Sequence, residues 1–188
     1  VVDKDCELSI LTFEDEGGKG AFRHTTSHIM AQAIKRLYPD TKLAIGPSIA
    51  DGFYYDVDRE TPLTSEDLEK IEAEMKKIVK SGLELERVEL SPEEAEKKLE
   101  EMNEPYKVEL VKEHSDKGEH ITFYKQGEFI DLCAGPHLMS VAPIKAIELT
   151  ACTGAYWRGD ANNAQLCRVY GVAFPKASML EEPVSYTH

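Results

Sequence analysis

Two short motifs place side chains that exchange protons or bind metals four residues apart. The first is His24-Thr-Thr-Ser-His28 and the second is Cys133-Ala-Gly-Pro-His137. If the fold brings the motifs together, three imidazoles and one thiol form a single cluster. Such a cluster suits either a metal site or a proton-transfer site, because imidazoles titrate near neutral pH and both groups ligate zinc. The choice between these two chemistries decides the function.

Three interpretations of the cluster remain open on the residues alone. A zinc site would use His24, His28, Cys133 and His137, although the first motif lacks the glutamate of a His-Glu-x-x-His metalloprotease. A nucleophilic Cys133 would need a base within about 3 Å, which sequence spacing does not establish. Imidazoles could also activate water without covalent chemistry. If the two motifs have no chemical function, the histidines are exposed residues of a helix and Cys133 is a buried core thiol.

The segments that carry these motifs combine helical and strand-like patterns. Hydrophobic spacing predicts a helix over 22–38, with both histidines of the first motif opposite its apolar face. Capping sequences at Thr64 and at Ser91-Pro92-Glu93-Glu94 predict two further helices. Because helices and strands do not alternate regularly, we expect an α+β fold in which an antiparallel sheet packs against helices in two layers. The predicted strands are 52–58, 83–90, 106–112, 120–125, 128–133, 145–153 and 165–174.

Composition and charge narrow the range of partners. The 188 residues carry a net charge of −13, which argues against binding along a nucleic-acid backbone but allows a pocket that grips one end of an RNA. Neither a membrane-spanning run nor a signal peptide is visible. Four cysteines at unrelated spacings predict no disulfide framework, and hence a reducing, cytoplasmic setting. The first residue is Val1 rather than methionine, which indicates a processed protein or an excised fragment.

Four sequence blocks occur in a characteristic order: His24-Thr-Thr-Ser-His28, Gly52-Phe53-Tyr54-Tyr55-Asp56, Asp131-Leu132-Cys133-Ala134-Gly135-Pro136-His137 and Gly154-Ala155-Tyr156-Trp157-Arg158-Gly159-Asp160. Together they resemble the amino-terminal editing domain of bacterial-type threonyl-tRNA synthetase, and the two histidine motifs are shared with alanyl-tRNA synthetase editing domains. The resemblance covers about residues 20–175. It implies that 1–19 is the tail of a preceding small ubiquitin-like domain with a linker, and that 176–188 is a C-terminal tail.

The resemblance implies an aminoacyl-tRNA deacylase that removes serine from threonine tRNA. Threonine exceeds serine by one methyl group, which gives a synthetic site only about 1–3 kcal/mol of discrimination, so a second, hydrolytic site is needed. The implied partners are the 3′ acceptor end of tRNA(Thr) carrying serine and the remainder of a synthetase, the parent being a homodimer. No cofactor is required, and ATP belongs to the missing ligase core. The alternative is a zinc-dependent hydrolase or a tRNA 3′-end binding module of the alanyl type.

The same resemblance assigns the residues of the site. Lys107 and His24 would position or deprotonate water, and Asp131 would recognise the serine amino group. Tyr55 would form an aromatic wall. Ala134 departs from the family, which usually has arginine there, and this removes a contact to tRNA phosphate. The implied catalytic residues are His24, His28, Lys107, Cys133 and His137, and the implied substrate-binding residues are Tyr55 and Asp131.

Overall fold

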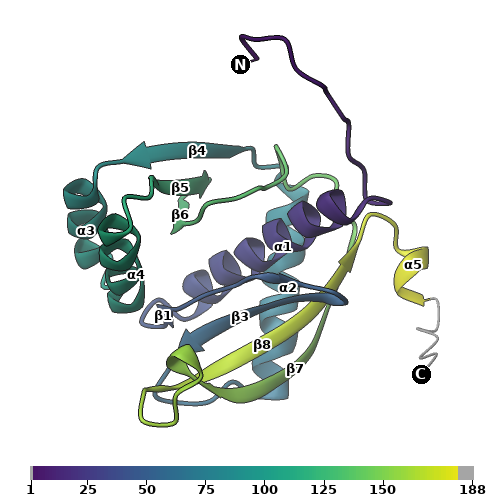
Figure 1. Ribbon diagram of the computed structural model, residues 1–188. Coiled ribbons are helices and arrows are strands. Elements are labelled where there is room, and N and C mark those ends of the chain that lie inside the picture. The colour runs from purple at the N-terminus through teal and green to yellow at the C-terminus, as the bar shows by residue number, and fades with distance from the viewer. Residues whose placement is uncertain (1, 182–188) are drawn as a thin grey trace.

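The computed structural model describes residues 2–181. The fold consists of helices and antiparallel strands (Figure 1). The helices are α1 (Glu16–Leu37), α2 (Ser65–Lys80), α3 (Pro92–Glu101), α4 (Pro105–Asp116) and α5 (Ser178–Glu181). The strands are β1 (Lys42–Leu43), β2 (Ser48–Ile49), β3 (Gly52–Asp58), β4 (Leu85–Leu90), β5 (Ile121–Gln126), β6 (Phe129–Leu132), β7 (Ala146–Tyr156) and β8 (Gln165–Phe174). One sheet has the order β1-β3-β8-β7, with β2 also paired to β3, and the second has the order β4-β5-β6. The predicted α+β class is confirmed, with two antiparallel sheets.

Helix α1 forms the centre of the molecule, between the two sheets (Figure 1). Its apolar side behaves as predicted, because Ile29, Met30 and Ile34 are fully buried in the main core. Its opposite side is covered as well: positions 25–34 are all buried, and His28 is only 3% exposed. The histidines therefore do not lie on a solvated face. The helix also begins six residues earlier than predicted, at Glu16.

The larger sheet supplies the other wall of the main core. Along β3 the side chains of Phe53, Tyr55 and Val57 alternate toward the helices and are fully buried. Helix α2 packs against the same side near β7 (Figure 1). It begins at Thr64 with a capping box, as predicted from the sequence. The sheet thereby holds Tyr55 beneath α1, facing the histidine motif.

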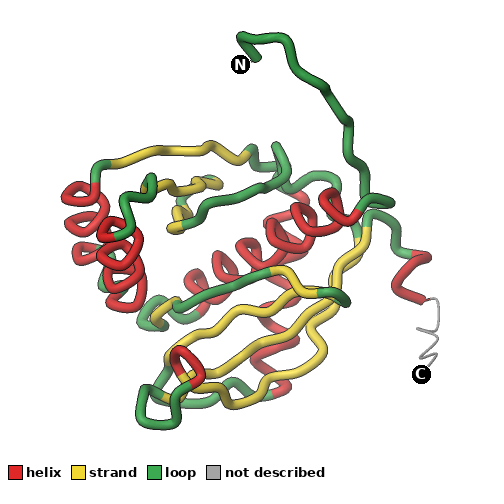
Figure 2. Tube along the Cα trace, in the orientation of Figure 1, coloured by secondary structure: helices red, strands yellow, loops and turns green. Residues whose placement is uncertain are grey.

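The predicted strand over 106–112 is wrong, because these residues belong to helix α4. Figure 2 shows α3 and α4 as two neighbouring helices beside the smaller sheet. The alternation of Val108 and Leu110 with charged residues resembles a strand pattern. Pro105 is the stronger signal, since proline at the first helical position loses no hydrogen bond. Helical geometry buries Val111 against α3 and points Lys107 inward.

The expectation that no disulfide forms is also wrong for one pair of cysteines. Cys152 and Cys167 are joined across β7 and β8. The antiparallel register pairs Gly154 with Cys167, so the two cysteines lie diagonally on neighbouring strands and on the same face of the sheet. Strand pairing, which the spacing of cysteines does not reveal, brings them together. Cys6 and Cys133 are free.

Residues 2–15 contain no helix or strand before α1 begins at Glu16. A short helix, α5, lies within the predicted C-terminal tail 176–188, and 182–188, like Val1, fall outside the described residues. Among the helices of the described part, none combines the length and the apolar character that a bilayer crossing requires.

Candidate functional site

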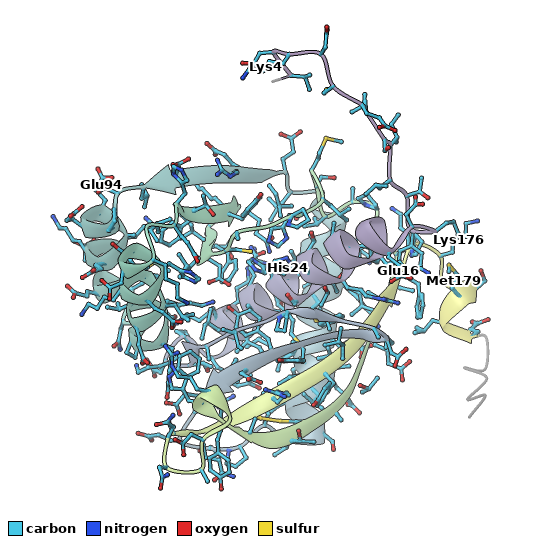
Figure 3. All side chains as sticks on the ribbon, viewed as in Figure 1. Lys4, Glu16, His24, Glu94, Lys176 and Met179 are labelled. Carbon is cyan, nitrogen blue, oxygen red and sulfur yellow. A yellow bond between two sulfur atoms is a disulfide. The ribbon has the colours of Figure 1, made fainter. Side chains whose placement is uncertain are left out.

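The two histidine motifs meet at the wall of a cavity of 380 Å³. Figure 3 labels His24, which is half-buried, on α1. Cys133 comes from the segment that follows β6, and its Sγ lies 3.3 Å from Nε2 of His24 and 3.2 Å from Nε2 of His137. The rings of His24 and His137 stack with their centroids 4.2 Å apart, and the ring of His28 lies 4.4 Å from that of His137. The structure thus brings three imidazoles and one thiol into a single cluster.

Local geometry explains how each motif presents its side chains. Residues four apart on a helix lie on one face, so α1 aims His24 and His28 at the same loop. The loop turns at Gly135, where φ is +79° and a Cβ atom would lie 2.5 Å from the hydroxyl of Tyr124. Only glycine fits there without displacing that ring. The turn also lets the Gly135 N–H donate to the sulfur of Cys133 at 3.2 Å.

Burial keeps the imidazoles of the cluster neutral. It lowers the pKa of His28 well below the usual value of 6.5, and it lowers the pKa of His137 to about 2. The pKa of His24 is lowered as well, chiefly by burial, although a hydrogen bond to the backbone of Pro136 opposes the shift. A neutral imidazole offers a lone pair, and His24, whose pKa is lowered less strongly than those of His28 and His137, is the best suited of the three to accept a proton.

Cys133 is a thiol rather than a thiolate in this environment. Burial raises the pKa of Cys133 to about 11, and the Gly135 N–H offsets only part of that effect. Since the thiolate is the reactive form of cysteine, a protonated Cys133 is a poor nucleophile near neutral pH. The arrangement therefore favours the proton-transfer interpretation over the cysteine nucleophile.

A buried ion pair lies beside the cluster. Lys107 of α4 is 4% exposed and lines the cavity, with its Nζ 3.1 Å from Oδ1 of Asp131. The hydroxyl of Tyr55 donates to Oδ2 of Asp131 at 2.5 Å, and Nε2 of His28 lies 3.7 Å from the same oxygen. Burial raises the pKa of Tyr55 well above its usual value, so the hydroxyl keeps its proton. Both oxygens of Asp131 are therefore engaged behind the cavity wall. Direct contact between Asp131 and a serine amino group would require this network to open.

Several residues of the site escaped the sequence analysis. His114, Glu119 and His120 line the cavity, where α4 and β5 meet. They stand in segments without a motif, so their types and spacing carried no signal. Thr25 lies inside the first motif, and its hydroxyl is 3.0 Å from Nδ1 of His137. Its position between two histidines was the one available clue.

The cluster also has the spacing of a metal site. One ligand atom from each of His24, His28, Cys133 and His137 lies within 4.8 Å of the others. A tetrahedral zinc ion would hold such atoms about 3.3–3.6 Å apart, which the two sulfur–nitrogen distances approach. Nδ1 of His28 is buried and has no hydrogen-bond partner within the part of the chain that the structure describes. The donor set is therefore compatible with a zinc ion.

Comparisons with known proteins agree with these motifs. Residues 121–170 match the family described as the threonyl and alanyl tRNA synthetase second additional domain. The threonine–tRNA ligase of Acetivibrio thermocellus is 60% identical over 180 residues, which are 96% of this chain and 28% of that protein. The ligases of Caldanaerobacter subterraneus and Clostridium tetani are 60% and 61% identical, also over 28% of their length. The chain thus spans less than a third of these relatives. These similarities confirm the resemblance of the chain to the editing domain of threonyl-tRNA synthetases.

Proposed function

We propose that the chain hydrolyses the ester that joins serine to the 3′ end of threonine tRNA. The observation that carries this proposal is the convergence of neutral histidines, a thiol and a lysine on one cavity, within a chain similar to threonine–tRNA ligases. Ester hydrolysis needs a base for water and a donor for the carbonyl oxygen. Both kinds of group line this cavity. The partners are the acceptor end of the tRNA and the remainder of a synthetase.

The histidines supply the base. Water adds to the carbonyl carbon of the ester, and the bond from that carbon to the ribose oxygen then breaks. His24 lines the cavity and carries a neutral ring, so it can take a proton from the attacking water. The same proton then passes to the ribose oxygen as it leaves. The products are free serine and a tRNA with both terminal hydroxyls restored.

Lys107 supplies the donor. Its ammonium group lies at the cavity wall, where it can donate to the carbonyl oxygen as negative charge develops there. Asp131 and Tyr55 lie behind Lys107 and are already bonded to one another. We assign them a positioning role, because they hold the ammonium group at the wall rather than touch the substrate. His28 and His137 shape the inner surface of the cluster.

A zinc-dependent hydrolase is the second candidate, and the compact set of four ligand atoms favours it. Zinc would be held by residues of the set His24, His28, Cys133 and His137, and it would supply a Lewis acid for the carbonyl where one of its positions is left open to the substrate. Metal analysis of freshly purified protein, with deacylation assayed with and without a chelator, separates the two candidates. Hydrolysis that survives the chelator in metal-free protein supports the metal-free mechanism. Hydrolysis lost with the metal and restored by zinc supports the alternative.

A pair of lysine variants on one helix tests the proposed chemistry. Lys107→Met removes the ammonium group from the cavity, and we expect it to lower kcat/KM for seryl-tRNA(Thr) by roughly 100-fold, as loss of an oxyanion donor does. Lys112→Met is the matched control, because Lys112 is exposed on the same helix. It should leave the rate unchanged. Equal rates for the two variants would remove Lys107 from the mechanism.

A further inference from the structure

The three residues between the histidines of the first motif are all hydroxyl residues, and all are fully buried. Thr26 donates its hydroxyl to the Phe22 carbonyl one turn back, at 2.9 Å, and within the described residues it makes no side-chain hydrogen bond to a histidine. Thr25 makes the equivalent bond to the Ala21 carbonyl at 2.8 Å. It differs from Thr26 because its hydroxyl also reaches Nδ1 of His137. This contact gives Thr25 a part in the cluster that Thr26 lacks.

The hydrogen bonds around Thr25 determine where the proton of His137 sits. The hydroxyl has one proton, which goes to the Ala21 carbonyl, a group that can only accept. The backbone N–H of Leu138 can only donate, and it does so to the same oxygen at 2.9 Å. At 3.0 Å from that oxygen, Nδ1 of His137 must therefore donate as well. The proton of the neutral ring lies on Nδ1, and Nε2 carries the lone pair.

His24 is fixed in the same way by the backbone. Its Nδ1 lies 3.3 Å from the carbonyl of Pro136, which can only accept, so its proton is also on Nδ1. Both Nε2 lone pairs then face the sulfur of Cys133, at 3.3 and 3.2 Å. The thiol has a single proton for two lone pairs. One basic nitrogen is left without a donor beside the cavity, where water or a ribose hydroxyl can supply one.

We propose that Thr25 is a positioning residue that fixes the Nδ1–H tautomer of His137, so that Nε2 of His137 accepts from the Cys133 thiol and the Nε2 lone pair of His24 stays free at the cavity. The tautomer itself is independent of any activity. Its effect on catalysis rests on the proposed function, because only a reaction that transfers a proton needs the free lone pair. Outer partners that orient a histidine ring act in this way at many metal and acid–base sites.

Nitrogen-15 NMR of the histidine side chains in the full chain tests the tautomer directly. The Nδ1 and Nε2 shifts of His137 should report a protonated Nδ1 in the unaltered protein. Thr25→Val, which is nearly isosteric, should move the ring toward the Nε2–H form that free histidine favours in water. Thr25→Ser, which keeps the hydroxyl, should restore the original shifts. Thr26→Val removes the neighbouring hydroxyl from the same helix and should leave them unchanged. A protonated Nε2 in the unaltered protein would overturn the proposal.

Deacylation of seryl-tRNA(Thr) by the same variants tests the consequence. Thr25→Val should lose roughly 10- to 100-fold in kcat, with little change in KM, while Thr25→Ser and Thr26→Val should stay close to the unaltered chain. Thermal unfolding of each variant shows whether it is folded. A rate for Thr25→Val equal to that of Thr26→Val, despite a changed tautomer, would overturn the catalytic part. If the unaltered chain has no deacylase activity, the proposed function fails while the NMR result still decides the tautomer.

Discussion

Hydrogen-bond partners, more than residue types, decide what the histidine cluster can do. Cys133 lies between two imidazoles and remains protonated because burial raises its pKa. In such a cluster the neutral imidazoles, which can act as bases, lie next to a thiol, which is a weak hydrogen-bond donor. The residue types of this cluster were readable from the two motifs. The tautomers were not, because they depend on Thr25 and on a carbonyl of the loop that is distant in sequence.

The lowered pKa values of the imidazoles predict the pH dependence of deacylation. A histidine acts as a base only when it is neutral, so activity is lost as pH falls through its pKa. Because burial lowers the pKa of His24, His28 and His137 below 6.5, we expect kcat/KM to stay level through pH 6.5 and to fall only at lower pH. Rates measured between pH 5 and 8 check this.

Folding stability should also decrease as the pH falls, so it must be measured as the control for the loss of activity. The unfolded chain binds protons at its histidines below about pH 6.5, whereas the folded chain resists them, so the free energy of unfolding decreases as the solution is acidified. Denaturation curves at each pH establish that the protein is still folded where rates are measured. A loss of activity with a midpoint near 6.5 in folded protein would contradict the assignment of neutral, buried bases.

Each element contributes one part of the site, and the elements differ in how well the sequence predicted them. The helix carrying the first motif and the strand carrying Tyr55 follow clear periodic patterns. For helix α4 the sequence predicts a strand, because Val108 and Leu110 alternate with charged residues, whereas Pro105 is compatible with the first turn of a helix. The error matters for Lys107, since a strand would not place it at this cavity wall. Its place in the site was expected from family resemblance alone.

A buried carboxylate fixes the start of helix α4. Glu104 accepts hydrogen bonds from Lys35 of α1 at 2.8 Å and from the Leu43 N–H of β1 at 2.7 Å. Glu104→Ala leaves the Leu43 N–H without its acceptor and removes the carboxylate from Lys35, which keeps its bonds to the carbonyls of Pro39 and Thr41. We expect a loss of about 2–3 kcal/mol in the free energy of unfolding. Glu104→Gln keeps an acceptor oxygen and should cost less. Urea denaturation measures both.

Ion pairs of Arg36, the neighbour of Lys35 on α1, give the comparison for Glu104. Arg36 pairs with Glu128 and with Glu74 near the surface, where solvent screening limits each such contact to under about 1 kcal/mol. Arg36→Ala should therefore be clearly milder than Glu104→Ala. Comparable losses for the two variants would show that the buried contact does not anchor α4.

The whole molecule assembles the site from parts of the chain that are far apart in sequence. The first motif and the cysteine motif are more than a hundred residues apart, and α1 meets the second one only because the two sheets enclose it. Local patterns predicted most elements and the fold class. They could not predict the pairing of β7 with β8, and for that reason they missed the bond between Cys152 and Cys167. Contacts between residues that are far apart in sequence produce no periodic pattern of hydrophobic residues.

The disulfide is a testable feature at this scale. It closes a segment with a sequence separation of 15 residues, for which the loss of unfolded-chain entropy predicts about 3 kcal/mol of stabilisation. Denaturant unfolding of the oxidised chain should therefore shift to lower concentration on addition of a reductant, and Cys152→Ser should reproduce that shift. Cys6→Ser, at the exposed free cysteine, should change nothing. If the reductant leaves the denaturant concentration at the unfolding midpoint unchanged, the disulfide does not form in solution.

The most direct test of the proposed editing function is the ratio of two deacylation rates. Single-turnover hydrolysis of seryl-tRNA(Thr) and threonyl-tRNA(Thr) by the unaltered chain compares esters that differ by one methyl group. We expect the seryl ester to be removed at least about 10-fold faster, because one methyl group in a close-fitting site is worth about 1–3 kcal/mol. Equal rates for the two esters, or no hydrolysis above the uncatalysed rate, would contradict the proposal that this cavity edits threonine tRNA.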